Sequence, residues 1–442
     1  MTIRMDEGAA ELLDTLHRAG YAAYVVGGCV RDSLLGLTPH DWDLCTSALP
    51  QQVMELFGAQ RCIPTGLQHG TVTVKQGGGL YEITTFRTEG AYTDGRHPDE
   101  VHFVPDVRED LARRDFTINA MAYNAKEGLI DPFGGQADLQ SGVLRAVGVP
   151  RQRFTEDALR ILRLYRFAAR FGFAIDPPTA QAAQELCAHL DCVSVERIEE
   201  ELAKLLSAPA PAAYLDEKIL GVVLPELSPE ALAAAKPVVD ACPAGERALP
   251  VRLAALLLSL GEDGTRRTLR RLRCSNACIE ETAVLVREVV SGVPGAFSSD
   301  TNRAIPSPAL LPAATGSHPS GRSSEKLPAR PPVSLNIYTR KLLGQYGLKT
   351  VQRLAALGTA LQPEHAADFA ALSELAEQLD ADGVCCRVSQ LAVNGRDLMA
   401  AGVPAGPGIR KVLEALLDGV IREEYPNERQ TLLAAVQQLA AS

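Results

Sequence analysis

The chain has 442 residues, of which 46% are hydrophobic and 22% charged, a composition typical of globular proteins. This length exceeds a single ordinary core, so we expect two to four domains. The apolar runs are too short to span a bilayer, and the ten scattered cysteines lack zinc-binding spacing. We therefore expect a cytoplasmic protein with reduced thiols, no structural zinc and no membrane partner. The oligomeric state stays open.

The formal net charge of −10 disfavours a generally basic nucleic-acid-binding surface. Arginines nevertheless gather locally, above all between Arg160 and Arg170. A basic face on an acidic protein therefore remains possible.

The first third of the chain alternates helix and strand patterns, which predicts a mixed α/β domain ending near residue 140. The predicted elements are, in chain order, a helix at 9–16, a strand at 21–26, a short helix at 29–36, a strand around Asp41 and Asp43, a helix at 50–57 and a hairpin of strands 71–75 and 80–86.

Helical patterns dominate the rest of the chain. One helix is predicted from Thr155, as its N-cap, to Gly172. Segment 291–334 is rich in proline and serine and lacks apolar periodicity, which predicts a disordered linker or insertion. Further helices are predicted at 195–207, 252–260, 264–273 and from Tyr338 to the C-terminus.

Asp41 and Asp43 flank Trp42, the only tryptophan of the chain. On a strand, residues two apart share a face, so the two carboxylates would project together while Trp42 faces the core. Close carboxylates repel each other unless a cation lies between them, and Mg²⁺ is the natural ion for oxygen ligands. Two such ions can promote an in-line phosphoryl displacement. A polar turn is the alternative explanation.

The stretch VVGGCVRD precedes these aspartates and reads as a strand, a double glycine and a helix. Gly28 would let the backbone approach an anion, the helix N-terminus would offer amide donors, and Arg31 would add a guanidinium for phosphate oxygens. A tight strand-to-helix turn is the alternative. Next to a metal-binding pair, however, the pattern favours a nucleoside triphosphate that is attacked at its α-phosphorus.

The stretch GGCVRDSLLGLTPHDWDLCTSALP resembles the signature of the class II tRNA nucleotidyltransferase and bacterial poly(A) polymerase superfamily, G-G-x-V-R-D followed by D-x-D. The resemblance covers residues 20–207. The similar segments that follow, in family order, are the flexible-loop region at 84–104, the ribose-recognition motif at 111–124, the end of the catalytic domain at 131–139, the base-selecting motif at 156–173 and the neck helix at 195–206.

The resemblance implies an α+β nucleotidyltransferase head, with a mixed β-sheet and helices, followed by all-α neck, body and tail domains. In the body, Leu258 and Ser259 occupy the His-Asp positions of HD phosphohydrolases, so we expect no phosphohydrolase activity. The expected division is a catalytic head at 1–140, a neck at 141–207, a degenerate HD-like body at 208–290, the insertion or linker at 291–334 and a tRNA-binding tail at 335–442.

Asp157 and Arg160 are three residues apart and would share one helix face. Cytosine and adenine both place an exocyclic amine beside a bare ring nitrogen, so an aspartate can accept from the amine while an arginine donates to the nitrogen. Uracil and guanine present the opposite pattern, which a buried polar site rejects. An ordinary ion pair is the alternative explanation.

Other nucleotide contacts come from the resemblance alone. It implies that Arg114 contacts the triphosphate and that Arg163 and Arg166 face the nucleotide or the tRNA end. It also implies that Asp115 and Asn119, four apart on a predicted helix, recognise the ribose 2′-hydroxyl.

The resemblance implies a CCA tRNA nucleotidyltransferase that uses CTP, ATP and Mg²⁺ and releases pyrophosphate. Asp41 and Asp43 would hold the metal ions, with Glu82 as a possible third acidic group. The tRNA would bind through its 3′ end and, at the tail, through its elbow.

Three alternatives stay open: a poly(A) polymerase, an enzyme that adds only CC or only A, and an inert tRNA-binding protein on the same scaffold. The loop segment 88–99 disfavours a CC-adding enzyme, and the tail disfavours a poly(A) polymerase.

Overall fold

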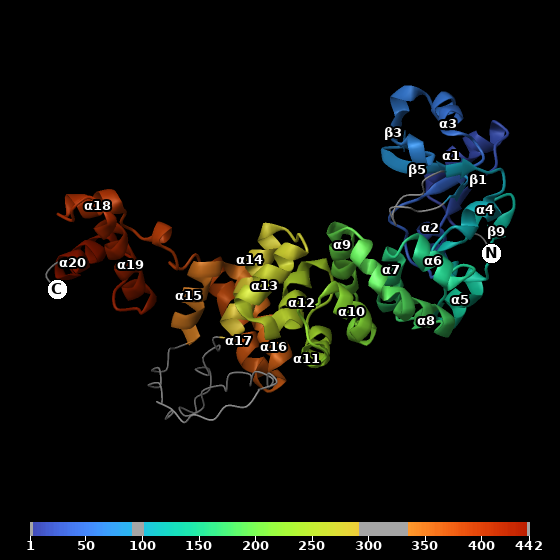
Figure 1. Cartoon of the computed structure of the whole chain (residues 1–442). Helices are drawn as coiled ribbons and strands as arrows, with labels where there is room; N and C mark the ends of the chain where they lie inside the picture. The colour runs from blue at the N-terminus through green and yellow to red at the C-terminus, as the bar shows by residue number, and fades with distance from the viewer. Residues whose placement is uncertain (1–2, 91–100, 291–334, 440–442) are drawn as a thin grey trace, which may run out of the picture. The chain divides into compact units, whose positions relative to one another are not determined.

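The computed structural model describes residues 3–90, 101–290 and 335–439. Contacts divide the chain into two compact units, Met1–Glu226 and Leu227–Ser442 (Figure 1). The predicted insertion at 291–334 and most of the loop segment 88–99 lie outside the described residues, so those two predictions are not tested.

The first unit is built on a seven-stranded mixed sheet with the order β3-β4-β5-β2-β1-β8-β9. The pair β2 and β5 is parallel and the other neighbours are antiparallel. The predicted hairpin is confirmed as β4 and β5. The strands of this sheet are β1 (Ala23–Val26), β2 (Leu44–Thr46), β3 (Cys62–Gly66), β4 (Thr71–Gln76), β5 (Gly79–Thr85), β8 (Ala122–Asn124) and β9 (Gly128–Ile130).

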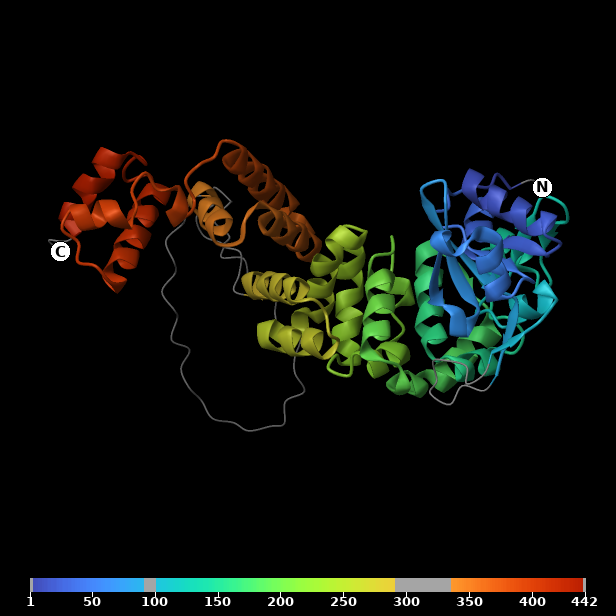
Figure 2. The ribbon, with the colours of Figure 1, turned by 90° about the horizontal axis from the view of Figure 1, so that it is seen from above.

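Helices cover this sheet, and the chain continues into a mainly helical region of the same unit, as Figure 2 shows in blue through green. Two small two-stranded sheets pair β6 (Arg87–Glu89) with β7 (Val101–Phe103) and β10 (Val143–Leu144) with β11 (Ala174–Ile175). The helices of this unit are α1 (Glu7–Arg18), α2 (Gly28–Leu34), α3 (Pro50–Phe57), α4 (Val107–Ala112), α5 (Gly135–Ser141), α6 (Pro150–Glu156), α7 (Leu159–Phe171), α8 (Pro177–Leu186), α9 (Val195–Leu206) and α10 (Glu217–Val223).

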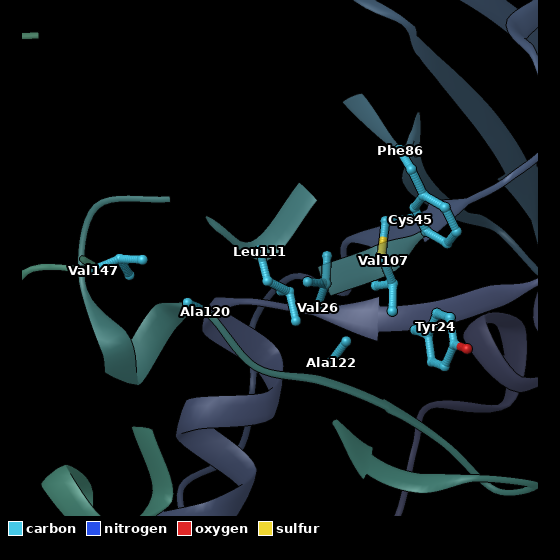
Figure 3. Close-up of a cluster of buried hydrophobic side chains, with 9 residues drawn as sticks. All are labelled: Tyr24, Val26, Cys45, Phe86, Val107, Leu111, Ala120, Ala122 and Val147. Atoms are coloured by element: carbon cyan, nitrogen blue, oxygen red, sulfur yellow. The ribbon is translucent and has the colours of Figure 1, made fainter. Parts of the chain in front are cut away.

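A buried apolar cluster joins the sheet to helix α4. Tyr24, Val26 and Cys45 from β1 and β2 lie together with Val107 and Leu111 from α4 (Figure 3). Each of these side chains is nine-tenths or more buried. Burial of this size stabilises the head by removing apolar surface from water and holds the segment after α4 beside the end of β1.

The predicted strand around Asp41 and Asp43 is wrong. Strand β2 begins only at Leu44, and the residues before it are irregular. The physical reason is that β1 ends at Val26, whose N–H donates to the Asp43 carbonyl, and the chain then turns away at Gly27. Residues before Asp43 therefore have no β1 partner, and aspartate itself is unfavourable in strands.

The predicted continuous helix from Thr155 to Gly172 is also wrong in its first turn. Thr155 lies inside α6, which ends at Glu156, and Asp157 adopts an extended conformation between α6 and α7. The Asp157 carboxylate accepts a hydrogen bond from the Leu159 N–H, which satisfies a free donor at the start of α7. The helix does end at Gly172, which is left-handed with φ of 68°.

The second unit is helical, and its last part has a separate apolar cluster that includes Leu398, Leu416, Val420 and Leu432. Among the helices that the structure describes, none is both long and apolar enough to cross a membrane. The helices of this unit are α11 (Pro229–Ala241), α12 (Leu249–Leu257), α13 (Gly261–Arg271), α14 (Asn276–Val290), α15 (Leu335–Tyr346), α16 (Leu348–Leu361), α17 (Ala366–Ala381), α18 (Gly395–Ala400), α19 (Pro407–Ile421) and α20 (Arg429–Leu439).

Gly135 allows α5 to approach the 3₁₀ turn at Thr117–Asn119 closely. A Cβ atom at Gly135 would lie 2.2 Å from the Thr117 carbonyl oxygen, which is backbone and cannot rotate away. We expect Gly135→Ala to lower the free energy of unfolding by about 2 kcal/mol through overpacking. Urea denaturation measures this change. Gly221→Ala is the control, because a Cβ there meets nothing within 4 Å; equal losses in both variants would contradict the explanation.

Candidate active site

Asp43 and Glu82 meet at one end of the parallel strand pair. Leu44 of β2 is in register with Ile83 of β5, so the residues just before them, Asp43 and Glu82, are neighbours. Although Asp43 keeps an exposed surface, partial removal from water raises the pKa of its carboxyl group, and the charges of Glu82 and Asp41 raise that pKa further. The site therefore has an excess of negative charge that a bound cation would relieve.

Arg114 provides a positive charge beside these acids and opposes the rise in the Asp43 pKa. It lies next to the glycine turn, since a Cβ atom at Gly27 would lie 2.9 Å from Arg114 Nη1. Gly27 has φ of 79°, which favours glycine there for a second reason. The predicted glycine turn, its neighbour Gly28 and Arg114 are thus brought to the same end of the sheet as Asp43.

Asp110 positions Arg114 and was missed in the sequence. Its carboxylate is fully buried and accepts from Arg113 Nε at 3.0 Å, from Arg114 Nη2 at 3.4 Å and from the Arg87 N–H at 3.3 Å. Burial would raise the Asp110 pKa, but Arg113 and Arg114 hold that pKa below its ordinary value. The spacing of three and four residues from Asp110 to the two arginines was a signal that could have found it.

Asp115 and Asn119 lie together, although not on the predicted α-helix. Asp115 follows α4 in an irregular segment, and Asn119 ends a 3₁₀ turn. The physical reason is that the Asp115 carboxylate accepts the Phe116 N–H at 2.8 Å, which competes with helical hydrogen bonding. Asn119 Nδ2 donates to Asp115 Oδ1 at 3.1 Å, so the two predicted ribose-recognising residues are in direct contact.

Arg163 and Arg166 of α7 belong to one partly buried network of charges, since both contact Glu201. Arg163 donates to Asp115 Oδ2 through Nε at 3.0 Å and Nη2 at 2.7 Å, and Arg166 Nε lies 2.6 Å from Glu201 Oε2. Burial would raise the pKa of Asp115, but Arg163 and its hydrogen bonds hold that pKa well below its ordinary value. Glu201, on α9, was missed because nothing in the local sequence indicates which helix it would face.

Asp157 and Arg160 do not pair with each other. Asp157 Oδ2 accepts from Arg197 Nη2 of α9 at 2.8 Å. Arg160 is buried, and its Nη1 donates to Glu156 Oε2 at 2.7 Å. Because Asp157 lies between two helices rather than on one, the shared helix face expected from a spacing of three does not form.

Arg160 nevertheless keeps free donors. Its Nη1 also donates to the Arg153 carbonyl at 3.2 Å, and its Nη2 donates to the Arg113 carbonyl at 3.0 Å. A guanidinium group has five N–H donors. Within the part of the chain that the structure describes, the Arg160 Nε–H and one N–H of its Nη2 make no hydrogen bond. Among these described residues, three of the five donors of Arg160 are therefore used within the protein, and two remain unused.

The acidic residues suit a hard divalent cation. Among the described residues, no group of three or more His, Cys, Asp or Glu side chains is arranged to hold a metal ion. The site instead offers the carboxylates of Asp41 and Asp43 with excess negative charge nearby. Small hard cations are commonly bound in this way, by one or two carboxylates together with substrate phosphates.

The head and neck together have the layout of an enzyme that transfers nucleotides, with acidic residues at a sheet end, an arginine beside a glycine turn and a buried polar cluster on the following helices. Three family models match the chain: the poly(A) polymerase head domain at residues 23–145, a probable RNA- and SrmB-binding site of polymerase A at 172–230, and a putative domain 2 of tRNA nucleotidyltransferase at 336–436. The protein is a nucleotidyltransferase.

The chain belongs to the CCA-adding enzyme family. It is 36% identical to the CCA-adding enzyme of Lactiplantibacillus plantarum, over 99% of this chain and 97% of that protein. The CCA-adding enzyme of Geobacillus thermodenitrificans is 34% identical, over 96% of this chain and 95% of its own. The crystal structure of the Bacillus stearothermophilus CCA-adding enzyme in complex with CTP matches with a TM-score of 0.78 and 30% identity, over 99% and 98% of the two chains. The family is metal-dependent.

Removal of the Glu82 charge tests the electrostatic assignment. We expect Glu82→Gln to lower the pKa of Asp43, because the carboxylate of Glu82 raises that pKa more than the carboxylate of Asp41 does. NMR titration of ¹³C-labelled aspartate carboxyl groups measures the pKa of Asp43 in each variant. Asp41→Asn is the matched control and should lower the Asp43 pKa less; the reverse order would show that Glu82 is not the nearer anion.

Proposed function

We propose that this protein adds C, C and A in turn to the 3′ end of tRNA, from CTP and ATP, without a nucleic-acid template. The observation that carries the proposal is the meeting of Asp43, Glu82 and Arg114 at one end of the sheet. The match to CCA-adding enzymes over nearly the whole chain favours this substrate, and the Bacillus stearothermophilus relative is known with CTP.

The transfer forms a bond from the 3′-oxygen of the tRNA to the α-phosphorus and breaks the bond from that phosphorus to the β-phosphate, releasing pyrophosphate. Asp41 and Asp43 would hold Mg²⁺, and the carboxylate of Glu82 would add to the negative charge around it. Mg²⁺ bound there would make the 3′-hydroxyl more acidic and neutralise charge on the pyrophosphate. Arg114, fixed by Asp110, faces the triphosphate, and the turn at Gly28 lets the backbone approach it.

In this proposal Asp157 and Arg160 select the base of the incoming nucleotide. Arg160 presents its free N–H groups to the ring nitrogen of C or A, while Glu156 and two backbone carbonyls hold the guanidinium plane. Asp157 accepts from the exocyclic amine, and Arg197 fixes its carboxylate. A rigid pair of this kind discriminates because a mismatched base leaves buried donors and acceptors unpaired.

The remaining assignments follow from the resemblance. Asp115 and Asn119 together form the ribose site. Arg163 and Arg166 hold this site in place and face the nucleotide. The tail at 335–442 binds the tRNA elbow. A cytoplasmic location remains a prediction from the tRNA substrate and the cysteine pattern.

Labelled CTP and ATP, offered with tRNA transcripts that end before CCA, after C, and after CC, test the proposed function. Full CCA addition supports it; extension by A alone, extension by CC alone, repeated addition of A and no extension each contradict it. Asp43→Asn is the control against contaminating activity and should lose extension while still binding tRNA.

We expect Arg160→Ala to reduce the preference for CTP over UTP by about tenfold, the effect of one lost hydrogen bond to a polar site. The ratio of kcat/KM values measures the preference. Arg151→Ala is the control: it removes an arginine of α6 whose exposed ion pair is with Glu185 of α8, and it should leave the ratio unchanged. Unaltered discrimination against UTP in Arg160→Ala would remove Arg160 from base selection.

A further inference from the structure

Arg31 has surroundings that do not suit the phosphate contact expected from the sequence. The residue is only 4% exposed. Its Nε donates to Asp32 Oδ1 at 2.8 Å, its Nη2 lies 2.7 Å from the same oxygen, and its Nη1 donates to Asn119 Oδ1 at 2.6 Å. Each of the three guanidinium nitrogens thus has a partner within the protein, and the side chain has almost no exposed surface that a phosphate could reach.

Aromatic rings of α7 hold the Arg31 guanidinium in place. Its Cζ atom lies 5.3 Å from the centroid of the Phe167 ring and 4.9 Å from that of Phe171. These distances are in the range of cation–π attraction, which is stronger where water is excluded. Asp32, the partner of Arg31, also accepts a hydrogen bond from Arg170 Nη2 at 3.3 Å through its second carboxylate oxygen, Oδ2. A buried group fixed by so many contacts is suited to positioning a neighbour.

The neighbour that Arg31 positions is Asn119, whose side-chain amide lies between the donor Arg31 and the acceptor Asp115. Arg31 can only donate, so it requires the amide oxygen of Asn119 to face it. The Asp115 carboxylate, which is ionised, can only accept, so it requires the amide nitrogen. A flipped amide would set an NH₂ group against the guanidinium and an oxygen against the carboxylate. The orientation of Asn119 is therefore determined by its two charged neighbours.

This orientation leaves one group for a ligand. The Asp115 carboxylate already accepts four hydrogen bonds, from Phe116 N, Asn119 Nδ2, Arg163 Nε and Arg163 Nη2, and a carboxylate has about four acceptor positions. The amide nitrogen of Asn119 has two N–H groups, and only one of them, the donor to Asp115, is engaged within the described residues. The second N–H of Asn119 is the group left to meet a sugar hydroxyl.

We propose that Arg31 is a positioning residue for sugar recognition, which holds the Asn119 amide so that its free N–H donates to the ribose 2′-hydroxyl of the incoming nucleotide. Arg31 thereby sets the preference for ribonucleotides over deoxyribonucleotides, without touching the nucleotide. This inference rests on the proposed function, since it assigns Asn119 to the nucleotide site.

The test compares CTP with dCTP for wild type and variants, on a tRNA transcript that ends before CCA. In Arg31→Lys the charge remains beside Asp32, but the ammonium group lacks the rigid planar fork of donors that fixes Asp32 and Asn119 in one geometry. We expect the ratio of kcat/KM for CTP to that for dCTP to fall about tenfold, through a loss on CTP with little change on dCTP. If Arg31 instead contacts phosphate, both nucleotides lose equally and the ratio stays constant, which overturns the proposal.

Two further variants separate positioning from a general structural effect. Arg170→Met removes the other cation on Asp32 and a contact with the Phe171 ring, but Arg170 has no bond to Asn119, so the ratio should not change. Phe171→Leu keeps Arg31 but removes one of the two aromatic rings that hold its guanidinium group. This variant should lower the ratio by a smaller factor than Arg31→Lys does. This variant keeps the proposal testable if Arg31→Lys fails to fold.

A double variant provides the decisive comparison. Asn119→Ala alone should lower the sugar preference, and Arg31→Lys added to Asn119→Ala should lower it no further, because Arg31 acts only through Asn119. Additive losses would overturn the proposal. A wild-type protein that fails to incorporate CTP would contradict the proposed function itself, so the two failures are distinguishable.

Discussion

Repulsion between carboxylates at the end of the β2–β5 pair is the constraint on which the head depends. The parallel register places Asp43 beside Glu82; removal from water raises the pKa of Asp43, and the charges of Glu82 and Asp41 raise that pKa further. A bound cation would relieve this repulsion, because the negative charge that raises the energy of the site also strengthens cation binding. Folding energy from the apolar cluster between the sheet and α4 offsets that repulsion.

The arginines around this site fall into two groups with different physical roles. Arg114 lies beside the glycine turn and near Asp43, where its charge can act on a triphosphate. Among the described residues, Arg114 has one long contact to an oxygen atom of the protein, to Asp110 at 3.4 Å, whereas Arg31, Arg160 and Arg163 each make several shorter contacts to such atoms. In the second group the charge is neutralised or the donors are partly used, so these residues give shape and direction to the polar groups beside them.

The charged network also explains how the head and neck helices can form one site. Asn119 contacts Arg31 on α2 and Asp115 after α4, and Asp115 contacts Arg163 on α7. Each link is a directional hydrogen bond between buried or half-buried groups, so displacement of any one of them leaves another group unpaired. The residues that we propose for sugar recognition are thus held in one framework of hydrogen bonds that joins α2, the segment after α4 and α7.

The sequence by itself determined the elements whose patterns are local: the hairpin of β4 and β5, helix α3, the end of α7 at Gly172 and the glycine turn before α2. Its motif order also identified the class of enzyme. Only the tertiary structure decided which charged groups meet. Asp157 pairs with Arg197 rather than Arg160, and Arg31 with Asn119 rather than with an open phosphate site. The physical reason is that helical and strand periodicity depends on neighbouring residues, whereas an ion pair depends on where distant segments pack.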